Sequence, residues 1–505
     1  MKRMTICAAA AVLSVSVSVS SLALASSITD IGYTALQNEL GAATPTGAGV
    51  KVTQVEAPTN DTSGGAAPIF MSDPTDPEFS GKSITAISGN PSGSFSGHAT
   101  GVGQLFYGNS SSIASGVTQI DSYESFAWLN SLSVSSGPSI GTATTSASRI
   151  ANSSWVGTGA TAAQTGTILR FVDRQVQLNE YINVVGLANG NSNEPLLGSA
   201  YNVISVGRTD GIHQQSTVAV AGDSLYETVR SAPLIVAPEP STSAATPVVS
   251  AAAAVLVQTG HEGGLTLSKG STDIAGVGTI YNAERSETVK AALMAGADRE
   301  TANTSTSANI TDYRSAGHQT ENGLDDRYGA GQVNILNSYH IVAGGEQNSL
   351  QQGGSDIGRF GFDYVSAFGG LNGSPSTASY FFNAEEDATL SSSLVWNVGV
   401  SNDSALTTTL HHLNLSLYDV TLNALVAQSA STVDNTQNLW LKLSGGDRYE
   451  LRVTAGEAAN FSWDYALAWR LEGSPAPVPI PAAVWLFGSG LAGLVGLARC
   501  RRAAA

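Results

Sequence analysis

The chain has 505 residues, with 23 Lys and Arg against 40 Asp and Glu, and only 12% of its residues are charged. A typical globular domain is about 25% charged, so uncharged polar residues must supply much of this surface. The formal net charge of −17 argues against nucleic-acid binding and against docking on anionic lipid. With 42% hydrophobic residues the chain can bury a large core, and its length allows roughly two to four domains.

Residues 1–25 have the three parts of a secretory signal peptide. A basic start at residues 1–3 is followed by an uncharged apolar stretch, and the segment closes on Ala-Leu-Ala at 23–25. This order is typical of exported chains, and we predict cleavage after Ala25. The alternative is a buried N-terminal helix, which the polar sequence that follows at once disfavours.

Residues 26–345 alternate short apolar runs with helical patches. The apolar runs are bounded by Gly or Asn, as β-strands that end in loops are. Three of them span residues 50–55, 182–187 and 201–206. Helices are predicted at 162–178 and 245–259. This alternation predicts an α/β domain with a largely parallel sheet, in which sites form beyond the carboxyl ends of the strands.

Four residues of this domain suggest chemistry. A helix that opens near Pro247 places Ser243 just before or within its first turn, where free N–H groups favour a developing oxyanion. His98 begins a segment of small residues that suits a helix packed under a cleft. Asn189 closes a predicted strand and could donate an N–H to an oxyanion. With Glu56, these residues follow the order acid–His–Ser of one class of serine peptidase. Taken alone, the string around Ser243 is more often a cap on a buried Ala-rich helix.

The pattern changes after residue 345. Residues 346–474 contain segments that alternate inward and outward with turn residues between them, and clear examples are 378–382, 413–418 and 449–453. This alternation predicts an all-β sandwich of about 120 residues. A Pro-rich linker from Ser474 to Pro481 follows it.

Residues 475–505 end in an apolar run and a basic cluster. Ala482 to Ala498 contains no charge and is just long enough for a short membrane span, and three arginines follow it. On physical grounds this is a tail anchor. Val-Pro-Ile-Pro-Ala at 478–482, the span and the arginines together resemble a PEP-CTERM-type sorting signal in its Val-Pro-Leu-Pro-Ala variant. The resemblance implies removal by an exosortase in a Gram-negative bacterium, at the cell surface or outside it, with an exopolysaccharide matrix as partner.

The two cysteines, Cys7 and Cys500, lie in these two end segments. A mature protein without those segments would have neither a disulfide nor a thiol nucleophile. This excludes a cysteine peptidase and cysteine-ligated zinc.

Over roughly residues 45–345 the chain resembles the subtilases, the subtilisin-like serine peptidases. Segment 241–250 is similar to their nucleophile motif Gly-Thr-Ser-x-Ala-x-Pro, and segment 97–103 is similar to their histidine motif. The other matching segments are 47–56 (the strand that ends in the acid), 187–189 (the oxyanion segment, with Asn191 as an alternative), 152–155 (a substrate-lining strand end) and 329–334 (the approach to the last helix). The resemblance implies a subtilisin-like three-layer domain that hydrolyses peptide bonds. It implies Glu56, His98 and Ser243 as the triad, Asn189 at the oxyanion, and Ser154 and Trp155 beside the substrate.

The chain departs from the subtilase pattern at its acid. Glu56 stands where the family has Asp, Ala99 and Gly101 alter the histidine motif, and too few residues precede the first motif for a folded propeptide. A glutamate can orient histidine if the backbone retreats by about one methylene. Three interpretations stay open: an active Glu–His–Ser triad, an inactive relative, or a different acid, for which the nearby candidates are Asp61, Asp73 and Asp76.

No metal or cofactor is assigned from the sequence. Calcium ligation is conceivable at the acidic and amide pairs 325–326, 402–403 and 434–435, but turn capping is favoured at each of them. The remaining histidines considered lack metal-ligand spacing and are interpreted as structural or exposed: His261, His318, His340, His411 and His412.

Two hypotheses about function follow. The first is an exported serine endopeptidase that acts on protein or peptide through an acyl-enzyme on Ser243. The second is a catalytically inactive surface or matrix binding protein that uses the same fold as a scaffold. Intact His98 and Ser243 favour the first, whereas Glu56 and the altered flanks of His98 favour the second.

Overall fold

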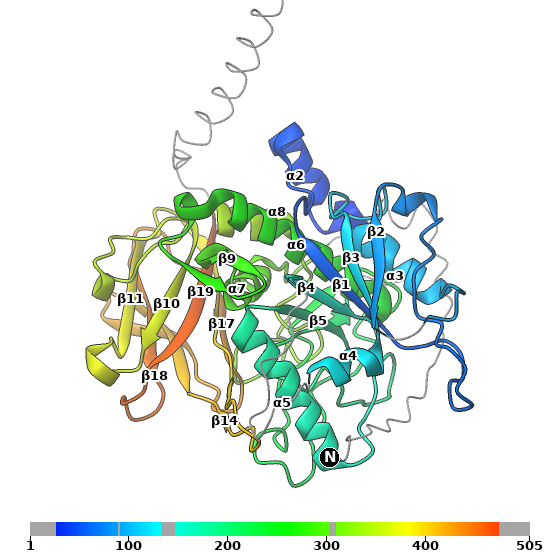
Figure 1. Ribbon diagram of the computed structural model, residues 1–505. Coiled ribbons are helices and arrows are strands. Elements are labelled where there is room, and N and C mark those ends of the chain that lie inside the picture. The colour runs from blue at the N-terminus through cyan, green and yellow to red at the C-terminus, as the bar shows by residue number, and fades with distance from the viewer. Residues whose placement is uncertain (1–26, 89–90, 133–146, 302–309, 474–505) are drawn as a thin grey trace, which may run out of the picture.

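The computed structural model describes residues 27–88, 91–132, 147–301 and 310–473. The predicted signal segment, the predicted C-terminal span and both cysteines lie outside these residues. The described chain forms an α/β domain followed by an antiparallel β-sandwich, which confirms the fold class predicted from the sequence. Figure 1 shows the yellow-to-orange sandwich strands beside the blue-to-green α/β domain.

The α/β domain is built on a seven-stranded parallel sheet in the order β2-β3-β1-β4-β5-β6-β7. Its strands are β1 (Lys51–Glu56), β2 (Ser83–Ser88), β3 (Gln119–Glu124), β4 (Ile150–Ser153), β5 (Ile182–Gly186), β6 (Ile204–Arg208) and β7 (Ile235–Ala237). Apart from the edge strand β2, their residues are mostly buried, polar ones included, because a parallel sheet covered by helices is buried on both faces. Two of these strands end in a buried carboxylate, because Glu56 closes β1 and Glu124 lies opposite it at the end of β3.

Helices cover both faces of this sheet. On one face lie α3 (Gly97–Tyr107) and α6 (Thr242–Leu267), and on the other lie α4 (Ser125–Leu132) and α5 (Ala162–Asn179). The alternation along β1 follows this arrangement: Val52 packs in the core with α3 and α6, and Val55 packs with α4 and α5. Because strand side chains alternate between faces, Gln54 and Glu56 point to the same side as Val52, toward α3. The layering is visible in Figure 1.

The central helix of the domain is α6. It is apolar and long enough to cross a membrane by length and composition, but 89% of its most apolar window is buried inside the protein. It packs against β4, β5 and β6. Gly186 permits this close approach, because a Cβ there would lie 2.8 Å from Oγ1 of Thr246. The helix is therefore a core element that the sheet and the neighbouring helices enclose.

Three further α-helices and a β-hairpin belong to the described part of this domain. These are α2 (Tyr33–Leu40), α7 (Ser286–Gly296), α8 (Ile335–Ala343) and a hairpin of β8 (Ser271–Ile274) and β9 (Gly278–Tyr281). Both α7 and α8 contact α6 and each other.

The sandwich consists of two four-stranded antiparallel sheets, β10-β19-β12-β17 and β11-β18-β15-β16. Their strands are β10 (Phe360–Phe368), β11 (Thr377–Asn383), β12 (Ala388–Val395), β15 (Leu413–Asp419), β16 (Ala424–Ser429), β17 (Thr436–Leu443), β18 (Arg448–Ala455) and β19 (Trp463–Gly473). A short pair, β13 (Gly399–Val400) with β14 (Thr408–Thr409), contacts α5 of the α/β domain through β13. The two sheets enclose an apolar core of their own.

The sandwich is joined to the α/β domain through α7. Strands β12 and β19 pack against this helix. Ser391 donates to the carbonyl of Ala295 at 2.7 Å, and the Arg470 guanidinium donates to the carbonyls of Ala295 and Ala297 at 2.9 Å each. The last carbonyls of a helix have no partner within it, so these contacts satisfy the end of α7 from the sandwich.

Candidate active site

Glu56 and His98 are in contact at the carboxyl edge of the sheet. His98 is the second residue of α3, whose N-cap Ser96 accepts a hydrogen bond from the Ala99 N–H at 3.1 Å. Oε2 of Glu56 lies 2.8 Å from Nδ1 of His98. Glu56 is only 1% exposed, whereas His98 is 19% exposed. The contact holds the imidazole by Nδ1 and leaves Nε2 for another partner.

The electrostatics of His98 are set by Glu56. Burial lowers the pKa of His98, and the negative charge and hydrogen bond of Glu56 raise it. The contributions of Glu56 prevail, so the pKa of His98 lies above its ordinary value. A carboxylate on Nδ1 stabilises the imidazolium that forms when Nε2 accepts a proton. The pair is therefore suited to general-base chemistry.

Ser243 lies in the first turn of α6. This confirms the predicted place of Ser243, although the helix does not start near Pro247: α6 begins at Thr242, with Ser241 as N-cap and Pro247 inside the helix. A proline inside a helix removes the N–H that would bond the carbonyl four residues earlier, which here belongs to Ser243. The Ser154 hydroxyl replaces it and donates to the Ser243 carbonyl at 3.1 Å. The Ser243 carbonyl therefore has a hydrogen-bond partner despite the proline four residues later.

The Ser243 hydroxyl donates to the carbonyl oxygen of Ser154 at 3.4 Å. Within the described residues it makes no hydrogen bond to His98. Their helices nevertheless lie together, since α3 packs against α6. Catalytic hydrogen bonds are often long or misaligned without substrate, and the 3.4 Å contact is a weak competitor for this hydroxyl.

Asn189 lies beside the start of α6. Its Oδ1 accepts a hydrogen bond from the Thr242 N–H at 3.0 Å. With Oδ1 occupied, the Nδ2 group is directed away from that N–H. Across the described part of the chain, neither Nδ2 of Asn189 nor the N–H of Ser243 has an acceptor, and Asn189 is exposed. Two adjacent donors are thus available for an oxyanion next to Ser243. The alternative, Asn191, is exposed two residues further along.

The alternative acids are occupied elsewhere. Asp61 accepts from the N–H of Ser63, Asp73 from Thr75 and Asp76 from Glu78. Glu56 is therefore the carboxylate that contacts His98 in this structure.

The two residues predicted to line the substrate follow the end of β4. Ser154 is buried, and its hydroxyl also accepts from the Asn152 amide at 2.9 Å. Trp155 is partly buried against the core on the α4–α5 face. Ser154 thus contacts the candidate nucleophile directly, while Trp155 lies next to it in the chain.

Sequence reasoning missed Gln54, which is 1% exposed and donates to Oε1 of Glu56 at 2.9 Å. The available signal was its place two residues before Glu56, on the same face of β1.

Acidic side chains from the three candidate calcium sites form hydrogen bonds and an ion pair with other residues of the protein. Asp325 accepts from the N–H groups of Arg314 and Arg327 and pairs with the Arg327 side chain. Asp403 caps a turn by accepting from Ala405 at 2.9 Å, and Asp434 accepts from the N–H of Ser231. Over the described ranges, no group of three or more His, Cys, Asp or Glu side chains is placed to hold a metal ion.

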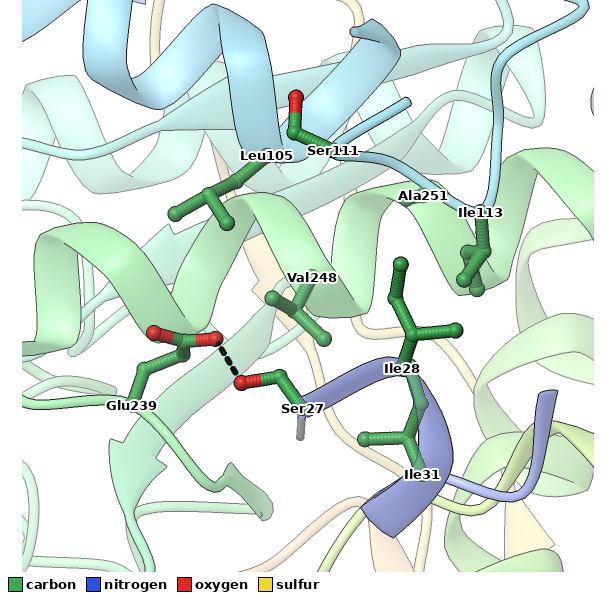
Figure 2. Close-up of a pocket in the computed structure, with 9 residues that line it drawn as sticks. All are labelled: Ser27, Ile28, Ile31, Leu105, Ser111, Ile113, Glu239, Val248 and Ala251. Atoms are coloured by element: carbon green, nitrogen blue, oxygen red, sulfur yellow. Dashed lines mark hydrogen bonds between the residues drawn. The ribbon is translucent and has the colours of Figure 1, made fainter. Parts of the chain in front are cut away.

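A pocket on the side of α6 lies apart from the Glu56–His98 pair. Figure 2 shows it between α3, α6 and the first described turn, with apolar walls and one acidic residue, Glu239. Ser27 donates to Oε1 of Glu239 at 2.6 Å. Burial, partly offset by this hydrogen bond and reinforced by Asp30, raises the pKa of Glu239 to about 7. Neither His98 nor Ser243 lines this pocket.

No protein-family model matches the chain, and no curated protein matches it. Among solved structures, the prenylagaramide maturation protease PagA is 18% identical with a TM-score of 0.34, covering 58% of this chain and 93% of that one. A protease from Pseudoalteromonas arctica is 14% identical with a TM-score of 0.33, covering 59% of this chain and 91% of that one. The pre-peptidase C-terminal domain of a Bacillus anthracis collagenase is 16% identical with a TM-score of 0.16, covering 22% of this chain and 87% of that one. At such identities the function must be argued from the site itself.

Proposed function

We propose that the chain is a serine endopeptidase of the subtilase type that hydrolyses peptide bonds through Ser243. The observation that carries this proposal is the 2.8 Å contact between Oε2 of Glu56 and Nδ1 of His98. It lies at the carboxyl edge of a parallel sheet, where α/β proteins place their sites. The helix of His98 packs directly against the helix that carries Ser243. Glu56 then takes the place of the aspartate in this class of triad.

The proposed reaction proceeds in two half-reactions. Oγ of Ser243 bonds to the peptide carbonyl carbon while its proton passes to Nε2 of His98, and Asn189 with the N–H of Ser243 stabilises the oxyanion. The tetrahedral species breaks its C–N bond, and His98 gives the proton to the departing amine. A water then bonds to the acyl carbon and gives a proton to Nε2. The ester bond between that carbon and Oγ of Ser243 breaks, His98 returns the proton to Oγ, and the carboxylic acid product leaves. Glu56 keeps the proton on Nδ1 and stabilises the imidazolium throughout.

One observation favours the second candidate, a binding protein without catalysis. The Ser243 hydroxyl is turned to the carbonyl of Ser154 instead of His98. In an inactive relative this contact would persist in the presence of substrate.

Covalent labelling with a fluorophosphonate separates the two candidates, because the probe reacts only with an activated serine. We expect labelling of the wild type that is lost in Ser243→Ala and His98→Ala. Ser250→Ala is the matched serine control, since Ser250 lies on the same helix and bonds Asn152 and the Thr246 carbonyl. His411→Ala is the matched histidine control, because His411 forms another Nδ1–Glu contact of 2.8 Å in the sandwich. Labelling that survives Ser243→Ala would overturn the assignment, and a wild type that does not label would favour the binding protein.

We also propose that the chain is exported from a Gram-negative cell and sorted by its C-terminal segment. The support is the order of signal-like residues 1–25 and the motif, span and arginines of residues 475–505. An exosortase would remove the tail, and the exopolysaccharide matrix would be a partner. Intact-mass measurement of the exported protein tests this: we expect a species that begins near Ser26 and ends before the span. A mature species that retains Trp485 and Arg502 would indicate a permanent anchor instead.

A further inference from the structure

The two oxygens of the Glu56 carboxylate have different partners. Oε2 faces Nδ1 of His98, and Oε1 accepts a hydrogen bond from Nε2 of Gln54 at 2.9 Å. Gln54 lies on the same strand and the same face as Glu56, and both are 1% exposed. Glu56 is therefore held at both oxygens by neighbouring side chains.

The orientation of the Gln54 amide follows from the chemistry of its neighbours. Nε2 lies 2.9 Å from the Glu56 carboxylate and 2.8 Å from the carbonyl oxygen of Ala99. A carbonyl oxygen only accepts hydrogen bonds, so the amide must present its NH2 group to that side. Its oxygen faces the opposite side, where the Tyr107 hydroxyl donates to it at 2.5 Å. All these groups are buried, and the amide cannot turn over without leaving donors or acceptors unpaired.

This network joins β1 to the helix that carries His98. Ala99 follows His98 directly, and Tyr107 is the last residue of α3. The Ser72 hydroxyl lies 2.8 Å from the Ala99 carbonyl and 3.1 Å from Oε1 of Gln54, so it supports the same arrangement. The position of Glu56 relative to His98 is thereby fixed through α3 as well as through the strand.

We propose that Gln54 is a positioning residue that holds the Glu56 carboxylate on Nδ1 of His98, with Tyr107 fixing the Gln54 amide. This inference rests on the proposed peptidase function. Glutamate has one more rotatable bond than aspartate, so a single contact at Oε2 leaves it freer to turn away from the histidine. The second contact at Oε1 removes that freedom. Gln54 acts through Glu56 and does not itself meet the substrate.

Gln54→Met tests the proposal because methionine keeps the length of the side chain and removes both polar groups. We expect kcat to fall about 10- to 100-fold, the loss expected for one hydrogen bond to a charged group, with KM unchanged. The acid limb of kcat/KM against pH should move to lower pH, because both effects that raise the pKa of His98 are contacts with Glu56. Tyr107→Phe should change kcat in the same direction by a smaller factor, and it serves if Gln54→Met does not fold.

Gln437→Met is the matched control. Gln437 is a fully buried glutamine in the sandwich whose Nε2 donates to two carbonyls and whose Oε1 accepts from the Ser429 hydroxyl. Gln437→Met should lower the free energy of unfolding, as Gln54→Met should, but leave kcat and the pH profile unchanged. Wild-type kcat and an unmoved acid limb in Gln54→Met would overturn the proposal, and so would an equal loss of kcat in Gln437→Met.

The test also separates this inference from the proposed function. A wild type that does not react with fluorophosphonate refutes the peptidase, and an NMR titration of His98 then decides the positioning role. A lower pKa of His98 in Gln54→Met than in the wild type supports the role, and an unchanged pKa refutes it.

Discussion

Glu56→Gln is the sharpest perturbation of the proposed triad. The exchange keeps shape and volume, and the structure determines how the new amide will lie. Gln54 presents its NH2 group to the Oε1 side, so the substituted side chain must turn its oxygen there and its own NH2 group toward Nδ1 of His98. Nδ1 can then only accept, which places the imidazole proton on Nε2. In that tautomer His98 cannot take the proton of Ser243, and kcat should fall by about 10⁴.

The assay is single-turnover acylation and steady-state hydrolysis of a peptide substrate, with thermal unfolding as the control for folding. Glu56→Asp is the comparison that tests whether a shorter acid can still contact His98. Aspartate is shorter by one carbon–carbon bond, about 1.5 Å, so it cannot keep the 2.8 Å contact with His98 unless the backbone moves. We therefore expect activity to fall in Glu56→Asp despite the usual preference for that acid. Substantial activity retained in Glu56→Gln would refute this reasoning and direct attention to the aspartates of the following loop.

Three further predictions concern His98, Ser154 and Glu239. Hydrolysis should be lost as pH falls through a pKa of His98 that lies above the ordinary histidine value, and kcat/KM profiles measure this directly. Ser154→Ala should lower the free energy of unfolding by about 1–3 kcal/mol in urea titrations, because the Ser243 carbonyl loses the donor that replaces the N–H missing at Pro247. Glu239→Gln should raise Tm at pH 8 and leave it unchanged at pH 4. The folded-state pKa of Glu239, about 7, exceeds the ordinary 4.5, so a penalty of about 3 kcal/mol develops as pH rises between these values.

The sequence predicted best the helices and strands in which apolar residues recur with a clear period. The strand at 182–187 and the helix at 162–178 match β5 and α5 to within a residue. The strand predicted from 201 begins only at Ile204 in β6, because the N–H groups of Tyr201 and Asn202 are taken by the Asp173 carboxylate. Such a boundary depends on a residue far away in the chain, which a local pattern does not contain.

Contacts between distant residues also limited the prediction of the candidate active site. Glu56, His98 and Ser243 were visible as residue types in a known order, and the structure adds which atoms meet. The start of α6 was misplaced because proline is favoured in the first turn of a helix. Pro247 lies inside α6 instead, and the carbonyl that it leaves without an N–H is paired by the Ser154 hydroxyl, 89 residues away. The contact between Gln54 and Tyr107 spans 53 residues and has no sequence motif.

The network around Glu56 indicates how a glutamate could serve where the subtilase pattern has aspartate. Ordering a glutamate side chain costs up to about 2 kcal/mol of conformational entropy. If that ordering occurred only when substrate bound, it would raise the barrier of the reaction. In this protein β1 fixes the backbone of Glu56, and Gln54 and His98 fix its two oxygens, so the side chain is ordered when the chain folds. The cost is then part of folding, and the carboxylate is already oriented when charge develops on His98.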